Sequence, residues 1–340
     1  MLNQHLKVYS NRELFIQWYA WSIKYKDCDP AVWMTNYLFD RFEFNREQKL
    51  WFCWIYGNTY HLPTAWLIWN EFPDYELATF ERIDAWNSKN FKKLHYQTDT
   101  KYNKGHLPLM FKSYKELIGE GTQQEFFERL GAKNKYGMYE LIKNDFTQRQ
   151  HKFGRYTIWF YAQHLKHCAK MKIESSNLHL HDYSGSRSHR NGLMYAISMP
   201  DLIDEKLDIN CTLQFEAEAQ AILRECKSRF PEHYDELDFF TMETCLCSFK
   251  KLFRAKRGRY LGYYLDRQSE EIMQIEKDGW VGIDWNVLWQ AREETLDSRL
   301  SGRNKIRSEW FSDYVDRKEI RRMDWMFPFE KKKTGLEMFT

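Results

Sequence analysis

The scarcity of glycine and proline is the feature that most limits what this chain can fold into. Only 7 proline and 15 glycine residues occur among its 340 residues. Sheets need many turns, which these two residues supply, whereas long helices need few of them. Runs in which apolar and polar residues alternate are also few. The sequence therefore predicts an all-α, mainly helical fold with at most a few short strands.

Apolar residues recur at helical spacing along most of the chain. Pro30 and Pro63 fit the first turns of helices. The segment 171–195 differs, because it is rich in Ser, His, Asn and Gly, and we expect an ordered functional loop there with a short strand at Leu178–Leu180. Helices are predicted over 11–25, from 30, 46 and 63 onward, and over 75–95, 109–119, 122–131, 135–146, 153–168, 210–229, 238–257, 259–276 and 284–298.

Length and charge set further bounds. The length favours one large domain over 1–330, with two helical lobes dividing near 150–170 as the alternative, and a frayed tail over 331–340. No apolar run approaches the roughly 20 residues of a membrane span, and the first residues do not resemble a signal peptide. Seven scattered cysteines indicate free thiols in a reducing compartment. With a net charge of only +3, nucleic-acid affinity would have to come from a local patch.

A basic stripe follows residue 243 in "ETCLCSFKKLFRAKRGRYLGYYLDRQSEE" (243–271). Lys250, Arg254 and Arg257 share one face of the predicted helix. Together with nearby tyrosines such as Tyr263, these cations suit phosphate contacts combined with stacking on bases. A solvated charged face with tyrosines in the core is the ordinary alternative.

A polar cluster occupies "HDYSGSRSHRNG" (181–192). Hydroxyl and guanidinium groups such as those of Ser186, Arg187 and Arg190, placed around a glycine, are what a phosphate or pyrophosphate needs. The pattern matches neither GxxxxGK[ST] nor GxGxxG, so an ordinary polar loop is the alternative. Asp182 is the best-placed general base of this cluster, and an Asx turn is its alternative role.

Histidines and a cysteine gather in "FGRYTIWFYAQHLKHCAK" (153–170). His164 and Cys168 are four residues apart, as zinc ligands on a helix can be, but a second ligand pair is lacking. We therefore predict no metal site. Arg155 either lies beside the ring of Trp159 or begins the helix. The chain has no GxSxG, HExxH or kinase-type motif, so hydrolase and kinase functions lack support.

Four motifs in a fixed order resemble a known family. They are "EQKLWFCWIYGNTYHLPTAW" (47–66), "FGRY" (153–156), "DYSGSRSHRNG" (182–192) and "ETCLCSFKKLF" with "GRYLGYYLDRQ" (243–268). Over about residues 10–300 the chain resembles the amino acid:DNA transferases of bacterial viruses, a branch of the α-glutamyl/putrescinyl thymine pyrophosphorylases. The resemblance implies a helical fold related to helix–hairpin–helix DNA glycosylases. One departure is that "LIGEGTQQEFFERLGAKNKYG" (117–137) matches the family's hairpin only loosely.

The resemblance also implies a reaction. The substrate would be double-stranded viral DNA, in the cytoplasm of the infected bacterial host, whose 5-hydroxymethyluracil a separate kinase has pyrophosphorylated. The amine of an amino acid such as glycine, or of a polyamine, would displace pyrophosphate and leave a hypermodified thymine. No membrane partner is implied. No cofactor is certain, although Mg²⁺ accompanying the pyrophosphate is an option.

This chemistry assigns expected roles to the motif residues. Departing pyrophosphate needs cations and hydroxyls, and the attacking ammonium must first lose a proton. A base inside a duplex must be flipped out and stacked on rings. We expect pyrophosphate or DNA-phosphate contacts from Ser186, Arg187, Arg190, Lys250, Arg254 and Arg257. Proton transfer is assigned to Asp182 and His189, and the amino acid's carboxylate to Arg155. Base contacts are assigned to the rings of Trp54, Tyr56, Tyr60 and Tyr263 and to the polar groups of Asn58 and Thr59.

The aromatic segment 51–73 is expected to serve both core and site. Trp51, Trp66 and Trp69 fall at core positions. The proposed base-stacking rings flank a helix break at Gly57–Thr59, which would turn them toward a cavity.

Other functions remain open at this point. A DNA-binding or repair protein of the same fold would show salt-dependent duplex affinity without transfer chemistry. A glycosylase would leave abasic sites. A structural viral protein would leave the polar cluster at 182–192 unexplained.

Overall fold

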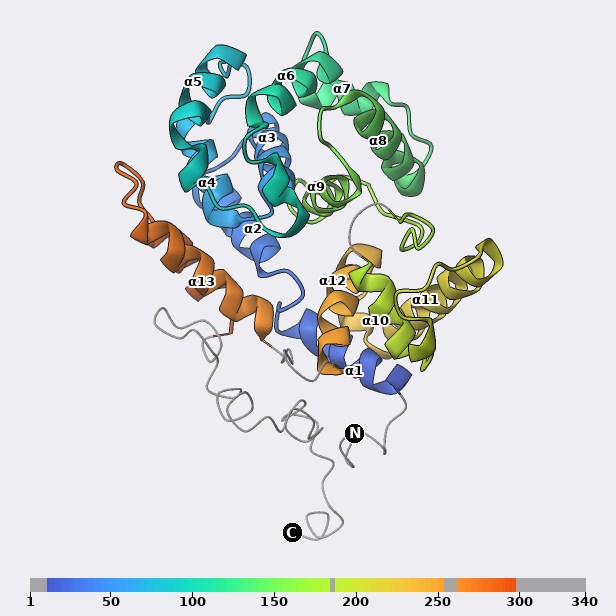
Figure 1. Ribbon diagram of the computed structural model, residues 1–340. Coiled ribbons are helices and arrows are strands. Elements are labelled where there is room, and N and C mark those ends of the chain that lie inside the picture. The colour runs from blue at the N-terminus through green and yellow to red at the C-terminus, as the bar shows by residue number, and fades with distance from the viewer. Residues whose placement is uncertain (1–10, 184–186, 254–261, 298–340) are drawn as a thin grey trace, which may run out of the picture.

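A computed structural model describes residues 11–183, 187–253 and 262–297, and the fold is stated for these residues. Within them the chain folds into helices and short 3₁₀ turns without a strand, which confirms the all-α class (Figure 1). Ser186, Arg254, Arg257 and the tail 331–340 lie outside the described residues. None of the described helices combines the length and the apolar content that crossing a bilayer requires.

The helices begin and end close to where the periodicity predicts them. Their bounds are α1 (Asn11–Lys24), α2 (Pro30–Arg41), α3 (Arg46–Thr59), α4 (Leu62–Glu71), α5 (Phe80–Asn90), α6 (Leu107–Ile118), α7 (Gln123–Arg129), α8 (Lys135–Arg149), α9 (Arg155–His167), α10 (Ser188–Ala196), α11 (Ile209–Arg229), α12 (Phe239–Phe249), α13 (Tyr263–Lys277) and α14 (Asn286–Thr295). Short 3₁₀ turns connect several of them, and the turn Lys250–Phe253 directly continues α12.

Two helices differ most from the expectation. The helix predicted over 75–95 begins only at Phe80, because Asp74 holds a preceding turn and Thr79 accepts a hydrogen bond from the Arg82 amide as the helix cap. The helix predicted over 238–257 ends at Phe249. Lys250 therefore lies on a tighter 3₁₀ turn and not on the regular helical face that the stripe assumed.

The predicted strand at Leu178–Leu180 is wrong. The backbone amides of Leu178 and Leu180 donate to the two carboxylate oxygens of the buried Glu216, at 2.9 and 2.7 Å, instead of to a neighbouring strand. His179 between them has a φ of 51°, in the left-handed region that strands do not use. The predicted loop over 171–195 is also too long, because its second half forms α10.

The helices gather in two groups (Figure 1). Helices α3 to α9 lie together in one group, and α1, α10, α11 and α12 in the other. The chain crosses between the groups after α9, while α2 packs against both α13 and α14. The single domain over 1–330 and its alternative, two helical lobes dividing near 150–170, stay predictions.

The segment 117–137, the loose match to the hairpin, forms the end of α6, the short α7 and the start of α8. Gly119 and Gly121 between α6 and α7 have positive φ angles of 72° and 94°. Thr122 and Glu125 then form a capping box at the start of α7.

Helix α3 continues through Gly57 and ends at Thr59, the last residue of the helix break predicted at Gly57–Thr59, and Tyr60 follows in the left-handed conformation. A Cβ atom on Gly57 would lie 2.8 Å from Cβ of Tyr161 in α9. Glycine at this position therefore permits the close crossing of α3 and α9, which makes it a packing residue. Trp51 and Trp66 are buried as expected.

Candidate active site

Three of the four sequence motifs converge on one group of side chains, the interior cluster, made of the buried His189, Glu243 and Lys250 and the partly buried Arg155 and Ser188. Arg155 is the first residue of α9, Ser188 and His189 begin α10, and Glu243 and Lys250 come from α12 and the turn that follows it. The convergence depends on Gly192, since a Cβ atom there would lie 2.1 Å from the Leu246 carbonyl oxygen. Glycine thus lets α10 approach α12 directly.

His189 and Glu243 form the centre of the interior cluster. Both side chains are buried, and His189 Nδ1 lies 3.5 Å from Glu243 Oε1. The Lys250 ammonium donates to the Ser188 hydroxyl and is itself only 5 % exposed. Glu243 Oε1 also accepts from the Cys247 thiol at 3.5 Å. An acid, an imidazole and an ammonium thus share one interior site.

Burial and charge shift the protonation of this pair. Burial, followed by the charges of Arg155 and Arg190, lowers the pKa of His189 well below its usual value. Burial also raises the pKa of Glu243, although Arg155 and Lys250 oppose that shift. At neutral pH His189 is therefore an unprotonated imidazole, which is the form that can accept a proton.

The predicted loop residues lie beside the interior cluster but in different roles. Arg190 is buried and donates to the Leu180 carbonyl at 2.6 and 3.1 Å and to the Asp182 carbonyl at 3.2 Å. Its guanidinium also lies 3.9 Å from the centre of the Tyr183 ring. Arg187 donates to the Asp204 carbonyl at 2.6 Å. Arg190 therefore fixes the loop onto α10, while Asp182 stays partly exposed at its edge.

A second polar group, the Tyr60 network of Asp29, Tyr60, Arg267 and Glu271, adjoins the interior cluster. The Tyr60 ring stacks on Phe160 at 3.5 Å, and the Arg267 guanidinium lies 5.1 Å from its centre. Arg267 donates to Glu271 at 2.7 Å. Burial raises the pKa of Tyr60 well above its usual value, and the charges of Asp29 and Glu243 add to this. The charge of Glu243 thus reaches Tyr60 from the interior cluster.

Burial dominates the protonation of Asp29 in this network. It raises the pKa of Asp29 to about 7, with Arg267 opposing the shift and Glu271 adding to it. Burial also raises the pKa of Glu271. Carboxyl groups that keep their protons near neutral pH are a common property of catalytic sites.

The other residues predicted to contact the base are mostly packed into the core. Trp54 is fully buried between the rings of Trp51 and Tyr114, with centroids 5.0 and 4.9 Å away. Tyr56 stacks on His164 at 3.7 Å. Asn58 and Thr59 are fully buried, and both donate to backbone carbonyls of their own helix. Tyr263, at the start of α13, is partly exposed.

Metal ligands do not assemble in the part of the chain that the structure describes, where no group of three His, Cys, Asp or Glu side chains is placed to hold an ion. His164 is buried against Tyr56, and burial lowers its pKa to about 3. The Cys168 thiol donates to the Val32 carbonyl at 3.5 Å. The His164 and Cys168 pair is thus part of the core packing.

Comparison with known families identifies the family of this chain. The sequence profile of the family described as "Amino acid:DNA transferase" matches residues 10–257. This chain belongs to that family. The match includes Arg155, Ser188, His189, Glu243 and Lys250, so the whole interior cluster lies within the region that defines an amino acid:DNA transferase.

A relative of this amino acid:DNA transferase is the serinyltransferase of Salmonella phage ViI, which is 27 % identical over 274 residues. The aligned region covers 75 % of this chain but only 65 % of the relative, so the chain spans about two thirds of the relative's length. No solved structure matches.

Sequence reasoning missed two carboxylates of this site, Glu243 and Asp29. On the helix predicted over 238–257, Glu243 and Lys250 are seven residues apart and would share one face, and that spacing could have identified Glu243. Asp29 had no such signal, because it reaches the site only through the packing of α2 against α13.

Proposed function

We propose that this amino acid:DNA transferase attaches an amino acid to viral DNA by displacing pyrophosphate from 5-(pyrophosphoryloxymethyl)uracil, in the cytoplasm of the infected host. The observation that carries the proposal is the unprotonated, buried His189 beside Glu243, with Arg155 and Lys250 around it. A proton acceptor among fixed cations suits a reaction in which an amine attacks and a polyanion departs.

The reaction balances with the residues present. His189 takes one proton from the amino acid's ammonium group, and the freed nitrogen forms a bond to the 5-methylene carbon of the base. The bond from that carbon to the pyrophosphate oxygen breaks, and its electron pair leaves with pyrophosphate. Lys250 and Arg187 are assigned to the departing phosphates, while Arg155 is assigned to the amino acid's carboxylate. Asp182, at the edge of the loop, is the alternative proton acceptor.

The packing narrows the residues assigned to the flipped base. Tyr263 is partly exposed, and Tyr60, although buried with one face against Phe160, is reached by the charge of Glu243, so both are assigned to stacking on the base. Trp54, Tyr56, Asn58 and Thr59 are buried within or beside α3, and we assign them to supporting Tyr60. Arg190 is assigned to holding the loop.

The donor amine and a metal ion remain to be assigned. The name of the phage ViI relative makes serine a donor to test beside glycine and polyamines. Mg²⁺ is proposed only as an ion carried by the pyrophosphate oxygens, with Glu243 as the acidic side chain of the interior cluster that could contact it.

Direct transfer is the experiment that tests this function. The protein is incubated with kinase-treated 5-hydroxymethyluracil DNA and a panel of amino acids and polyamines, with and without EDTA, and the nucleosides are analysed by mass. We expect one nucleoside whose mass equals 5-hydroxymethyl-2′-deoxyuridine plus the donor minus water, together with released pyrophosphate. Abasic sites would instead indicate a glycosylase, and duplex binding without a new nucleoside would indicate a DNA-binding protein.

A further inference from the structure

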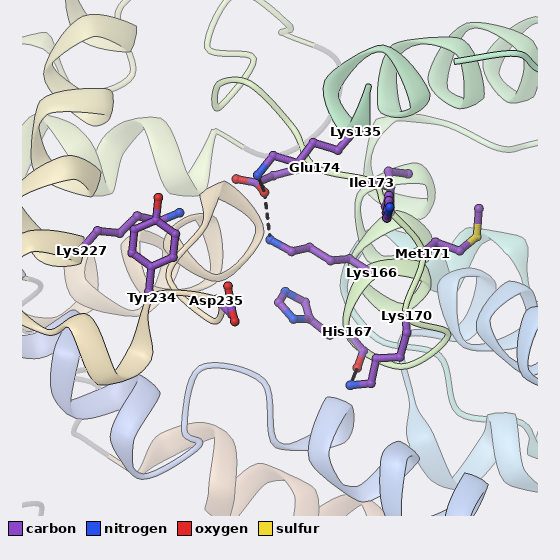
Figure 2. A pocket seen from close by; sticks show the side chains of 11 residues that line it. Lys135, Lys166, His167, Lys170, Met171, Ile173, Glu174, Lys227, Tyr234 and Asp235 are labelled. Carbon is purple, nitrogen blue, oxygen red and sulfur yellow. Dashed lines mark hydrogen bonds and ion pairs between the residues drawn. The ribbon is translucent and has the colours of Figure 1, made fainter. Parts of the chain in front are cut away.

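A hollow lined by lysines lies at the other end of α9, away from the interior cluster. Its volume is about 720 Å³ (Figure 2). Five of its lining residues are lysines from separate segments: Lys135 of α8, Lys166 of α9, Lys170 and Lys172 of the loop that follows, and Lys227 of α11. We call this hollow the lysine pocket. Figure 2 shows Lys227 and Tyr234 on one wall, facing Lys166, His167 and Lys170 on the other.

The carboxylates near the lysine pocket neutralise only part of its charge. Glu174 pairs with Lys135 at 2.5 Å and with Lys166 at 3.2 Å. The fully buried Asp238 pairs with Lys166 at 2.6 Å and with His167 at 2.9 Å. These contacts hold Lys135 and Lys166 in place. The acidic residues that line the pocket are Glu174 and Asp235, against five lysines, so a positive charge remains.

Three lysines of the pocket are available to an anion. Lys170 and Lys172 are exposed, and the Lys170 ammonium donates to the His167 carbonyl at 2.7 Å. The Lys227 ammonium lies 4.2 Å from the centre of the Tyr234 ring, which is 56 % exposed. A cation held over an exposed ring can contact a phosphate while the ring meets a sugar or a base.

A second hollow extends the lysine pocket. Its volume is about 640 Å³, and it shares Lys170 with the first. It adds the cations Lys26, Arg41 and Lys49 against the carboxylates Asp40 and Glu294, so a positive charge remains here too. The Lys26 ammonium lies 4.8 Å from the ring centre of Trp33 in its wall. A compact anion would occupy one hollow, whereas two cationic hollows joined at a lysine suit a chain of phosphates.

The separation of the pocket from the interior cluster also favours a polymer. Arg155 and His167 are the first and last residues of α9, so they lie about 18 Å apart at a rise of roughly 1.5 Å per residue. That distance is too long for one pyrophosphate to reach both sites. It corresponds to about five nucleotide steps at roughly 3.4 Å along a strand.

We propose that the lysine pocket binds the phosphodiester backbone of the DNA substrate, about five nucleotides from the base that reacts. The pocket is then a positioning site, because it touches DNA without touching the reacting atoms. The inference rests on DNA being the substrate, as in the proposed function. It does not depend on which group is transferred.

The test compares two triple variants of the full chain for binding to unmodified duplex DNA at several salt concentrations. K170Q/K172Q/K227Q removes the available cations of the pocket and leaves the buried pairs of Glu174 and Asp238 intact. The matched control K89Q/K92Q/K101Q removes three exposed lysines of the α5 region. Thermal melting confirms that both variants fold.

We expect the pocket variant to bind duplex roughly 10- to 100-fold more weakly near 0.15 M salt, and the control to bind as the parent does. The slope of log K against log salt should become shallower by about 0.9 for each lost phosphate contact. Equal slopes and affinities in parent and pocket variant would overturn the proposal. So would an unchanged duplex affinity combined with weaker inhibition by added pyrophosphate, because the pocket would then hold the product.

The two proposals can fail separately. A parent protein that binds duplex through the lysine pocket but forms no new nucleoside would refute the transfer chemistry and leave this inference standing. Normal transfer by the pocket variant, with unchanged duplex affinity, would refute this inference and leave the transfer chemistry standing.

Discussion

The two ends of α9 carry cations in opposite settings. At its first residue, Arg155 joins an interior cluster whose imidazole, carboxyl and ammonium groups are buried. At its last turn, Lys166 and His167 open onto a hollow where several lysines remain exposed. Burial changes protonation and fixes geometry, which chemistry requires. Exposure keeps charges mobile and hydrated, which suits contact with a polyanion of any sequence.

Two buried aspartates show the same difference. Burial raises the pKa of Asp29, in the Tyr60 network, to about 7. Burial also works to raise the pKa of Asp238, but the charges of Lys166 and His167 outweigh it and hold that pKa below its usual range. One carboxyl is therefore kept close to its protonated form and the other is kept ionised. The lysine pocket is built on a stable anion, whereas the Tyr60 network holds a carboxyl that can change charge.

The largest effect is expected from His189→Gln. Removing the proton acceptor should slow transfer roughly 100- to 10,000-fold, because the attacking ammonium then has no partner for its proton. Duplex binding should not change, since the lysine pocket is intact. Single-turnover transfer and duplex binding are measured on the same preparation, and Asp182→Asn is the matched variant. A full loss of transfer in Asp182→Asn, with no loss in His189→Gln, would mean that Asp182 in the loop is the proton acceptor.

A pH series on the parent protein sharpens this assignment. The pKa of His189 lies well below its usual value, so no loss of rate is expected as pH falls through the ordinary histidine range near 6.5. Because His189 takes the proton from the bound ammonium form, the rate should instead stay level through this range. An inflection near 6.5 that disappears in His189→Gln would contradict the buried, neutral state of this residue.

The next effect is a difference between Asp238→Asn and Asp29→Asn. Asp238→Asn removes the carboxylate that Lys166 and His167 share and leaves Lys166 paired with Glu174 alone, which should cost about 1–3 kcal/mol near pH 7. The contribution of Asp238 is present above its unfolded pKa and is lost as pH falls through the lower folded value. Urea unfolding between pH 3 and 8 measures both variants. Equal stabilities of Asp238→Asn and the parent at pH 7 would contradict the pairing.

The contribution of Asp29 to stability should change with pH in the opposite direction to that of Asp238. Its folded pKa of about 7 exceeds the unfolded value near 3.9, so between these pH values the folded state binds more protons. Its contribution is complete below the unfolded value and declines as pH rises toward 7. Asp29→Asn should remove this decline. If the stability of Asp29→Asn changed with pH as steeply as that of the parent, a group other than Asp29 would bind the extra proton of the folded state.

The sequence predicts the helices well because their causes are local. Periodic apolar residues and caps such as Thr79 and Asn134 lie within the helices they define or next to them. The strand at Leu178–Leu180 was predicted wrongly because its amides are satisfied by Glu216, 36 to 38 positions later in the chain. Local patterns contain no information about such a partner.

Only part of the interior cluster could be predicted from the sequence, because only some of its residues belong to local patterns. His189 and Lys250 stand out because hydroxyls and cations cluster around them in the sequence. Their meeting with Arg155 depends on helix packing, and Gly57 and Gly192, which permit that packing, look like ordinary glycines in the sequence. The lysine pocket draws on residues from 135 to 227 that share no motif. Its charge was therefore invisible until the chain was folded.

A smaller effect is expected from Gly192→Ala, which tests whether the interior cluster depends on close helix contact. The added Cβ atom would meet the Leu246 carbonyl, and overpacking of this kind typically costs 1–3 kcal/mol. Gly105→Ala is the matched control, since a Cβ there meets nothing within 4 Å. Stability by urea unfolding and transfer rate should both fall for Gly192→Ala only. A variant as stable and as active as the control would show that α10 can shift without disturbing His189.

The smallest effect is expected from Tyr234→Ala, which asks how the lysine pocket holds DNA. If the ring only positions the Lys227 ammonium, duplex affinity should fall roughly 2- to 5-fold, as expected for loss of an exposed cation–π contact. Tyr102→Ala is the control, because that ring is also exposed and lies 5.2 Å from the Lys101 ammonium. A loss much above tenfold on single-stranded DNA would mean that a base stacks on Tyr234. The lysine pocket would then contact bases as well as phosphates. It would differ from the interior cluster only in being exposed.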